Sequence, residues 1–269
     1  MTALLEIDQA AVHFGGVKAL DGVSMTIESG TLCGLIGPNG SGKSTLLGAM
    51  SRLTSLTSGR LVIEGTEYTR VPPHKASAHG IARTFQTVRL LESMTVLANV
   101  MIGSATQAVQ RGPLANWLVV RRSRADNRAA RTKAEGALER VGMRDFAAAY
   151  PHDLPYGHQR HVEIARALAS GPRLLLLDEP TAGMNHSERD EVGDLLMALN
   201  AEGLTQVLVE HDLAMIHRVC NHTFALNFGK VIAEGTPAEV SRNPAVREAY
   251  LGHGALAAAS AKPLESSPR

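Results

Sequence analysis

Hydrophobic and polar residues alternate or cluster in short stretches along the chain, and these patterns predict its strands. Between Val23 and Glu28 every second residue is hydrophobic, so this segment is expected to form a strand with one buried face. A run of four leucines ending at Asp178 predicts a second strand with the length of a buried core element. Further strands are predicted at residues 31–36, 61–64, 206–209, 223–226 and 231–234, the last two as a hairpin.

Helical periodicity appears between these strands. Hydrophobic residues recur at helical spacing over residues 187–199, and Ser187 with Asp190 resembles a capping box at the start of that helix. Residues 95–150 are rich in Ala, Arg and Leu and are expected to be mostly helical. Other helices are predicted at residues 46–50, at 213–219 and from 237 onward. Strands that alternate with helices in this way predict an α/β protein.

The composition describes a folded chain without a dominant charge. The chain has 269 residues, 44% of them hydrophobic and 20% charged, which fits one large domain or one domain with an inserted subdomain. The formal net charge is only +1, so no global field favours a nucleic acid or an acidic membrane surface. Aromatic residues make up 4%, which gives no stacking platform for bases, and no nucleic-acid partner is predicted.

The sequence predicts no membrane-spanning segment, no signal peptide and no paired cysteines. No apolar run approaches the roughly 18 to 20 residues that span a bilayer. Glu6 and Asp8 lie where a signal peptide would be apolar, so the chain is expected to stay in the cytosol. Cys33 and Cys220 have no CxxC partner and are expected to be buried, inert thiols.

A glycine-rich segment directly follows the predicted strand at residues 31–36 and matches the pattern GxxxxGK[ST]. In such a loop backbone N–H groups converge on phosphate oxygens, the lysine adds a positive charge, and the serine hydroxyl can bind Mg²⁺. The alternative is a glycine-rich turn with no ligand. The strand before it and the helix after it favour a site for ATP with Mg²⁺, formed by Gly37, Pro38, Asn39, Gly40, Ser41, Gly42, Lys43, Ser44 and Thr45.

Two carboxylates end the four-leucine strand, at the sheet edge where α/β proteins bind ligands. Asp178 can hold Mg²⁺ through its water shell, and Glu179 can orient and partly deprotonate the attacking water. The alternative is that both carboxylates only cap the following loop. The phosphate-loop pattern earlier in the chain favours the catalytic interpretation.

These motifs, in this order, resemble the ATP-binding subunit of an ATP-binding cassette (ABC) transporter. The diagnostic segment is LPYGHQ at residues 154–159, which resembles the signature of that family and precedes a predicted helix and the Asp178 strand. In the family the signature of one subunit closes over the ATP held by the other subunit. The resemblance therefore assigns contact with a partner's ATP to Pro155, Tyr156, Gly157, His158 and Gln159. Pro155 stands where the family usually has serine and offers neither a hydroxyl nor an N–H.

Four further positions take their expected roles from the resemblance alone. Gln86 matches the glutamine that contacts Mg²⁺ and the membrane partner, and His211 matches the switch histidine at the γ-phosphate. Phe14 matches the aromatic residue that stacks on adenine, although a core position is the alternative for an early phenylalanine. Asn185 ends the inter-subunit loop, where the family usually has aspartate. The expected Mg²⁺ contacts are thus Ser44, Gln86 and Asp178.

The resemblance also implies a fold and partners. Residues 3–252 are expected to form the ATPase domain: an α/β phosphate-loop (RecA-like) NTPase core with an N-terminal antiparallel β-subdomain and an α-helical subdomain inserted at about residues 95–165. Residues 253–269 are expected to be a disordered tail. The implied partners are a second ABC ATPase subunit, identical or homologous, two transmembrane permease subunits and, indirectly, an extracytoplasmic solute-binding protein. The expected location is the cytoplasmic face of the inner membrane, as a peripheral subunit.

The cargo is suggested by the Tyr156 and Gly157 pair and by further segments that resemble the branched-chain amino-acid importer ATPases. These segments are RTFQTVRL at residues 83–90, GTP at 235–237, NP at 243–244 and YLG at 250–252. Urea or amide importers, lipopolysaccharide exporters, and non-transport or regulatory cassette proteins remain alternatives. A basic stretch from Arg121 to Lys133 is either a solvated helix face or a contact for anionic lipids.

Overall fold

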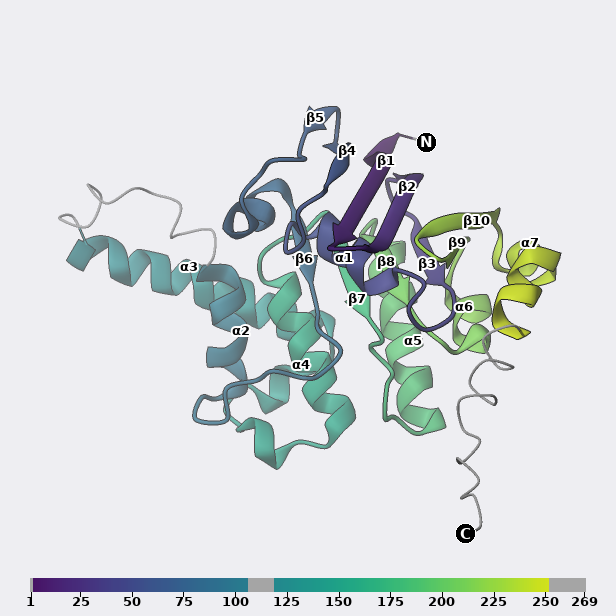
Figure 1. Cartoon of the computed structure of the whole chain (residues 1–269). Coiled ribbons are helices and arrows are strands. Elements are labelled where there is room, and N and C mark those ends of the chain that lie inside the picture. Colours follow the sequence, from purple (N-terminus) through teal and green to yellow (C-terminus); the bar gives the residue numbers. More distant parts are fainter. Residues whose placement is uncertain (1, 106–118, 252–269) are drawn as a thin grey trace, which may run out of the picture.

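The chain folds around two β-sheets that lie over one another, with helices gathered mainly on one side (Figure 1). The computed structural model describes residues 2–105 and 119–251. The tail predicted at residues 253–269 lies outside the described residues.

The larger sheet has six strands in the order β10-β9-β3-β8-β7-β6. All neighbouring pairs are parallel except β9 with β10, which form the predicted antiparallel hairpin. The α/β fold class is therefore confirmed. The strands are β3 (Leu32–Ile36), β6 (Ile81–Arg83), β7 (Leu174–Asp178), β8 (Thr205–Val209), β9 (His222–Asn227) and β10 (Lys230–Gly235).

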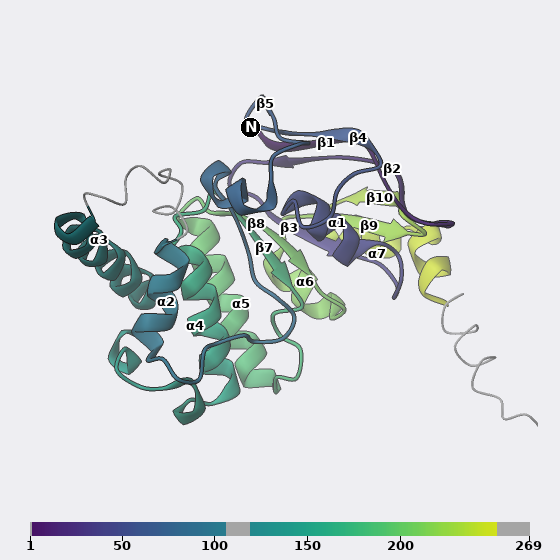
Figure 2. The same ribbon diagram turned by 60° about the vertical axis from the view of Figure 1, so that its left-hand side comes forward.

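The smaller sheet is antiparallel, in the order β2-β1-β4-β5, and covers one face of the larger sheet (Figure 2). The predicted alternation is confirmed in β2, where Val23, Met25 and Ile27 are all buried. The first strand of the chain was not predicted. The strands are β1 (Ala3–Phe14), β2 (Val17–Glu28), β4 (Ser58–Ile63) and β5 (Thr66–Glu67).

The helices form two groups. Figures 1 and 2 show α2, α3 and α4 as a bundle beside the sheets, while α1, α5, α6 and α7 lie next to the strands. The bounds 95–165 for an inserted helical subdomain stay a prediction. The helices are α1 (Lys43–Met50), α2 (Val96–Ala105), α3 (Val119–Arg140), α4 (Tyr156–Leu168), α5 (His186–Ala201), α6 (Leu213–Val219) and α7 (Pro237–Arg242), with short 3-10 helices at η1 (Pro73–His79), η3 (Arg144–Phe146) and η4 (Pro151–Asp153).

Each face of the larger sheet is covered by its own hydrophobic cluster, and β7 contributes to both. Leu174 and Leu176 pack into the cluster shared with the antiparallel sheet and α1. Leu175 and Leu177 pack into the cluster formed with the helices of the other face. A strand covered on both faces needs leucine at consecutive positions, which explains the uninterrupted run in the sequence.

The start of α5 corrects one prediction. The capping box is not formed by Ser187 and Asp190; it is formed two residues earlier by Asn185 and Glu188. The Asn185 side chain accepts a hydrogen bond from the backbone N–H of Glu188, and the Glu188 side chain accepts one from the N–H of Asn185, both at 3.0 Å. The prediction was wrong because serine and asparagine are equally good caps and sequence spacing alone does not choose between them.

Two features of the described residues bear on membranes and redox chemistry. Among residues 2–105 and 119–251, no helix has the length and hydrophobicity to cross a bilayer. Cys33 and Cys220 are buried, as predicted. Burial raises the pKa of the Cys220 thiol to about 12 and that of Cys33 well above its usual value, so both are weak nucleophiles.

Candidate active site

The glycine-rich segment forms a loop between β3 and α1, and at two of its glycines no side chain would fit. A Cβ on Gly37 would lie 2.2 Å from the carbonyl oxygen of Leu226, and one on Gly42 would lie 2.6 Å from that of Ala19. Both glycines also have positive φ, at 148° and 109°. The glycines of the motif therefore let neighbouring strands approach the loop and fix its shape.

Lys43 is buried and points back into this loop. Its ammonium donates hydrogen bonds to the carbonyl oxygens of Gly37, at 2.7 Å, and Pro38, at 2.9 Å. Burial lowers the pKa of Lys43, while the carboxylates of Glu179 and Asp178 oppose that shift. The positive charge thus lies between the loop and the two carboxylates, and Ser44 beside it is exposed.

Asp178 is held by a residue that the sequence analysis did not assign to the site. The guanidinium of Arg83, at the end of β6, lies 2.8 Å from the Asp178 carboxylate, and both side chains are nearly buried. A second nitrogen of Arg83 donates to the Ser51 hydroxyl at 3.3 Å. A nearly buried carboxylate is costly without a partner, and Arg83 provides Asp178 with an ion pair and a hydrogen bond.

Three of the predicted residues meet at the carboxylate of Glu179. The side-chain amide of Gln86 donates to one oxygen at 2.8 Å, and Nε2 of His211 lies 2.8 Å from the other. The backbone N–H of Glu179 donates to the carbonyl of Val209, which fastens the end of β7 to β8. The structure thus brings together Gln86, Glu179 and His211, from three different parts of the chain.

Glu210 is a further member of this region that sequence reasoning missed. Its buried carboxylate accepts hydrogen bonds from the hydroxyl of Thr181, at 2.7 Å, and from the backbone N–H groups of Thr181 and His211. Burial raises the pKa of Glu210, against the effect of these hydrogen bonds. The carboxylate therefore ties the loop after Glu179 to the backbone of His211. Its position just before His211 was the only signal in the sequence.

Tyr250 is a third residue that the sequence analysis did not assign to this site. Its hydroxyl accepts a hydrogen bond from the backbone N–H of Gly37 at 2.9 Å. On the other side of the loop, the N–H of Gly229 donates to the carbonyl of Ser41 at 2.8 Å. The loop is thus fastened by residues from the last part of the described chain.

The signature residues lie apart from the phosphate loop of their own chain. Pro155 is the N-cap of α4, in the helical bundle away from α1 (Figures 1 and 2). Pro155 and Tyr156 are exposed, and Gln159 donates to the carbonyl of Leu154 at 3.0 Å. Gly157 packs beside Glu188 of α5. The segment presents a helix N-terminus, which favours an anion.

The other predicted residues lie as follows. Phe14 ends β1 and is 58% exposed, so it is not a core residue. Asn39 and Gly40 form the exposed tip of the phosphate loop. Asn185 is engaged as the cap of α5. In the basic stretch, Arg131 is exposed and pairs with Glu135 at 2.7 Å, whereas the side chains of residues 119–125 lie outside those the structure describes.

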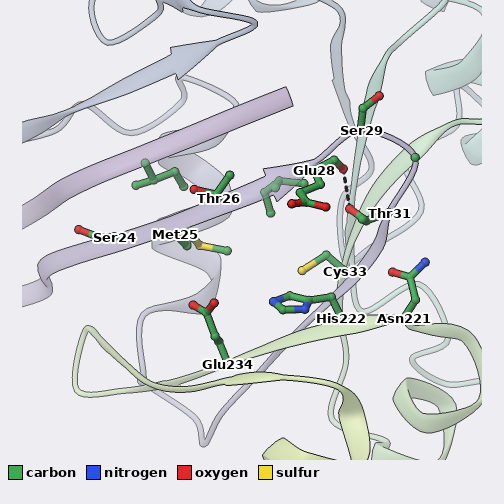
Figure 3. A pocket seen from close by; sticks show the side chains of 13 residues that line it. Ser24, Met25, Thr26, Glu28, Ser29, Thr31, Cys33, Asn221, His222 and Glu234 are labelled. Carbon is green, nitrogen blue, oxygen red and sulfur yellow. Dashed lines mark hydrogen bonds between the residues drawn. The ribbon is translucent and has the colours of Figure 1, made fainter. Parts of the chain in front are cut away.

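A separate cavity of about 700 Å³ lies at the end of the larger sheet where β3 and β9 begin (Figure 3). It opens between the end of β2 and the starts of β3 and β9, with the side chains of Glu28, Cys33, His222 and Glu234 along it. The phosphate loop follows the other end of β3, and both site carboxylates lie at the matching end of β7, which runs parallel to it in the sheet. The cavity is therefore not part of the candidate site.

Comparisons with known proteins agree with this geometry. Residues 20–182 match the family described as ABC transporter, and residues 230–255 match one described as branched-chain amino acid ATP-binding cassette transporter. The chain is 36% identical to the high-affinity branched-chain amino acid transport ATP-binding protein BraF of Pseudomonas aeruginosa, over 93% of this chain and 98% of that protein. It is 33% identical to LivG of Escherichia coli, of the same description, with the same coverage.

Two solved structures resemble this chain in fold. An ABC transporter cassette in its ADP conformation superposes with a TM-score of 0.82 at 31% identity, covering 94% of this chain and all of that one. A dimeric cassette in a post-hydrolysis state with ADP and phosphate superposes with a TM-score of 0.70 at 26% identity, covering 87% of this chain and 99% of that one.

Proposed function

The chain belongs to the ABC transporter family, and we propose that it is the ATP-hydrolysing subunit of an importer for branched-chain amino acids. The observation that carries the catalytic part is the cluster at Glu179, where Gln86 and His211 hold one carboxylate beside the phosphate loop. The cargo is proposed from the names of relatives that match nearly the full chain.

ATP binding is assigned to the loop at residues 37–42 and to Lys43, Ser44 and Thr45. The loop amides and the ammonium of Lys43 provide donors and positive charge for the phosphates. Phe14 is proposed to stack on the adenine. The hairpin that carries Phe14 continues into Ala19, whose carbonyl lies against Gly42. The exposed ring is thus on a strand pair that touches the loop.

Hydrolysis is assigned to Glu179 as the general base. Its carboxylate accepts a proton of the attacking water as the bond from the water oxygen to the γ-phosphorus forms. At the same time the bond from the γ-phosphorus to the bridging oxygen breaks, and that oxygen leaves with ADP. Gln86 and His211 fix the orientation of that carboxylate and offer hydrogen-bonding groups to the water or to the γ-phosphate. The departing ADP and phosphate carry the extra negative charge that Lys43 and the loop amides stabilise.

The oxygen atoms near the loop suit a hard divalent cation. The exposed hydroxyl of Ser44, the carboxylate of Asp178 and the side-chain carbonyl of Gln86 are the donor types that Mg²⁺ prefers. When bound, Mg²⁺ would neutralise phosphate charge during the transfer. Asp178 is also paired with Arg83, which holds its carboxylate in place near the proposed cation.

A second ATPase subunit is proposed to complete each site. The signature residues 155–159 lie at an exposed helix N-terminus and do not meet the phosphate loop of their own chain. An N-terminus of this kind can bind the γ-phosphate of ATP held by a facing subunit. Similarity to a dimeric cassette supports this arrangement. Bound ATP would then favour the closed pair, and hydrolysis would reopen it.

The membrane partners are proposed to dock in a groove beside Gln86. A cavity of about 400 Å³ lies between the sheet and the helical bundle, with Leu53, Phe85, Ile102 and Arg166 among its lining residues. Leu53 is 57% exposed and Ile102 39%, which leaves an apolar surface for a permease segment. The subunit would act at the cytoplasmic face of the membrane, with two permeases and, indirectly, a solute-binding protein.

The test uses the assembled transporter. Glu179→Gln removes the general base and should lower the rate of steady-state phosphate release by about 10²- to 10⁴-fold, with ATP binding retained. Glu202→Gln, a change at an exposed carboxylate that pairs with Arg140, is the matched control and should stay within a few-fold of the parent. Equal rates for Glu179→Gln and the parent would remove Glu179 from the reaction. Purifying the tagged chain from solubilised membranes would identify its permeases and thereby test the cargo assignment.

A further inference from the structure

The charged side chain of Arg160 on α4 is completely buried, which is rare for arginine. We propose that Arg160 is a positioning residue: together with Glu163 and Arg166, it fastens the backbone of residues 85–89 to α4. Gln86 therefore moves with the signature segment and not with the sheet. The kinetic part of this inference rests on the proposed function, whereas its mechanical part does not.

The first observation is the set of hydrogen bonds that the Arg160 guanidinium makes. It donates to the carbonyl oxygen of Phe85 at 2.7 Å and to that of Gln86 at 2.7 Å. It also donates to the Glu163 carboxylate at 2.6 Å and lies 3.4 Å from the hydroxyl of Tyr156. One planar group thus contacts two consecutive carbonyls of the segment and a residue of the signature.

The second observation is that Glu163 lies between two arginines. Its buried carboxylate pairs with Arg160 and, at 3.4 Å, with Arg166. Burial raises the pKa of Glu163, and the two arginines oppose that shift. Arg166 in turn donates to the carbonyl oxygen of Arg89. The two arginines therefore hold the segment at both of its ends, and Glu163 compensates their buried charge.

The third observation places the junction between sheet and bundle. The backbone N–H of Thr84 donates to the carbonyl of Leu176 on β7, so the chain up to Thr84 is fastened to the sheet. From Phe85 on it is held by α4, and Asn99 of α2 then binds the backbone of Leu91 through both its oxygen and its nitrogen. A relative motion of sheet and bundle must therefore be absorbed between Thr84 and Phe85.

This junction lies next to the reaction site. Gln86 donates to the Glu179 carboxylate, which follows β7 of the sheet. If residues 85–89 follow α4, the bond between Gln86 and Glu179 depends on where the bundle sits. The position of the signature segment at the start of α4 is thus transmitted to the general base within one chain.

Arg160→Lys is the most informative variant because it keeps the buried charge. A lysine can pair with Glu163, but it lacks the rigid fork that holds two carbonyls at once. Arg166→Lys is a second variant at a more exposed position, in case the first does not fold. Arg140→Lys is the matched control, since Arg140 pairs with Glu202 on the surface and does not touch residues 85–89.

The measurement is the distance distribution between two spin labels on the full chain without nucleotide. Labels go on cysteines introduced by Thr87→Cys, in the segment, and Thr132→Cys, on α3; both positions are exposed. The native cysteines are buried and weakly reactive, so they need not be removed. A second pair, Thr132→Cys with His217→Cys on α6, reports whether the bundle as a whole has loosened.

Arg160→Lys should broaden the distance distribution between positions 87 and 132 about two-fold and leave the distribution between positions 132 and 217 unchanged. The control Arg140→Lys should leave both distributions unchanged. In the assembled transporter, kcat should fall by about 10- to 100-fold with KM for ATP within two-fold, because only the placement of Gln86 changes. An unchanged distribution, equal broadening of both pairs, or an unchanged kcat would each overturn the inference. Failure of the parent to bind ATP would overturn the proposed function instead. The distance distributions would still test whether Arg160 fastens residues 85–89 to α4.

Discussion

Glu179 has a backbone φ of 46°, in the left-handed region that a side chain disfavours. Such a conformation costs roughly 1 to 2 kcal/mol and persists only when its surroundings hold it. Here the backbone N–H is fastened to Val209, and the carboxylate is held by Gln86 and His211. The strained backbone turns the carboxylate out of β7 and toward the phosphate loop, which agrees with its proposed role as general base.

Glu210 gives a prediction on pH at the same scale. In the folded chain burial raises the pKa of Glu210 above the usual value of 4.5. Below pH 4.5 the residue is protonated in both states. Above pH 4.5 the unfolded chain loses the proton first. The contribution of Glu210 to the free energy of unfolding therefore falls as pH rises from 4.5 through the higher pKa of the folded state.

Glu210→Gln should remove this titration. Chemical unfolding of parent and variant over a pH series should show the stability of the parent, relative to the variant, declining as pH rises above about 4.5. Glu163, whose pKa burial also raises, is present in both chains, so its contribution cancels in the comparison. A difference that is constant with pH, or that grows as pH rises, would contradict the raised pKa of Glu210.

At the scale of elements, the sequence predicted the strands whose patterns are regular and missed β1, which is interrupted, as well as the short strands β5 and β6. The alternation in β2 and the leucines of β7 were sufficient to find both. In β1 the pairing register shifts repeatedly, and Gln9 has a φ of 48°. These bulges place Leu4 and Leu5, and Ala10 and Ala11, at consecutive buried positions. Period-two alternation is lost there, so pattern alone gave no strand.

The cap of α5 provides a test at this scale. Asn185→Ala removes the side-chain acceptor for the N–H of Glu188 and should lower the free energy of unfolding by about 1 kcal/mol. Ser187→Ala is the control suggested by the sequence alone and should have little effect. Chemical unfolding of the two variants would decide between the two positions, and a larger loss for Ser187→Ala would contradict the observed cap.

At the scale of the whole molecule, the candidate site divides into parts that local sequence could predict and parts that it could not. The phosphate loop, Asp178 and Glu179 are encoded in short motifs with a strand on one side. The pairing of Arg83 with Asp178 and the contact of Arg160 with Phe85 join residues 95 and 75 positions apart. Nothing local in the sequence marks such contacts, because they arise only when the sheet and the bundle pack together.

Lys43 links the phosphate loop to the behaviour of the whole chain. Lys43→Ala removes the charge inside the loop and should abolish the rise in melting temperature that Mg-ATP gives the parent. A ligand raises the melting temperature only when it binds the folded state. Lys18→Ala, at an exposed lysine paired with Asp21, is the control and should keep the full rise. The same pair should differ in ATP-dependent association measured by light scattering. A rise that persists in Lys43→Ala would contradict the assignment of the phosphate loop.

The place of β3 in the larger sheet has a consequence for biosynthesis. This strand leaves the ribosome early, yet its two neighbours, β8 and β9, are among the last strands to emerge. Until then both of its edges lack partners, and the nascent chain exposes an apolar strand of the kind that promotes aggregation. The proposed phosphate loop reaches its observed packing only when Leu226 and Gly229 arrive against it. Nucleotide recognition is therefore among the last properties that a growing polypeptide of this kind acquires.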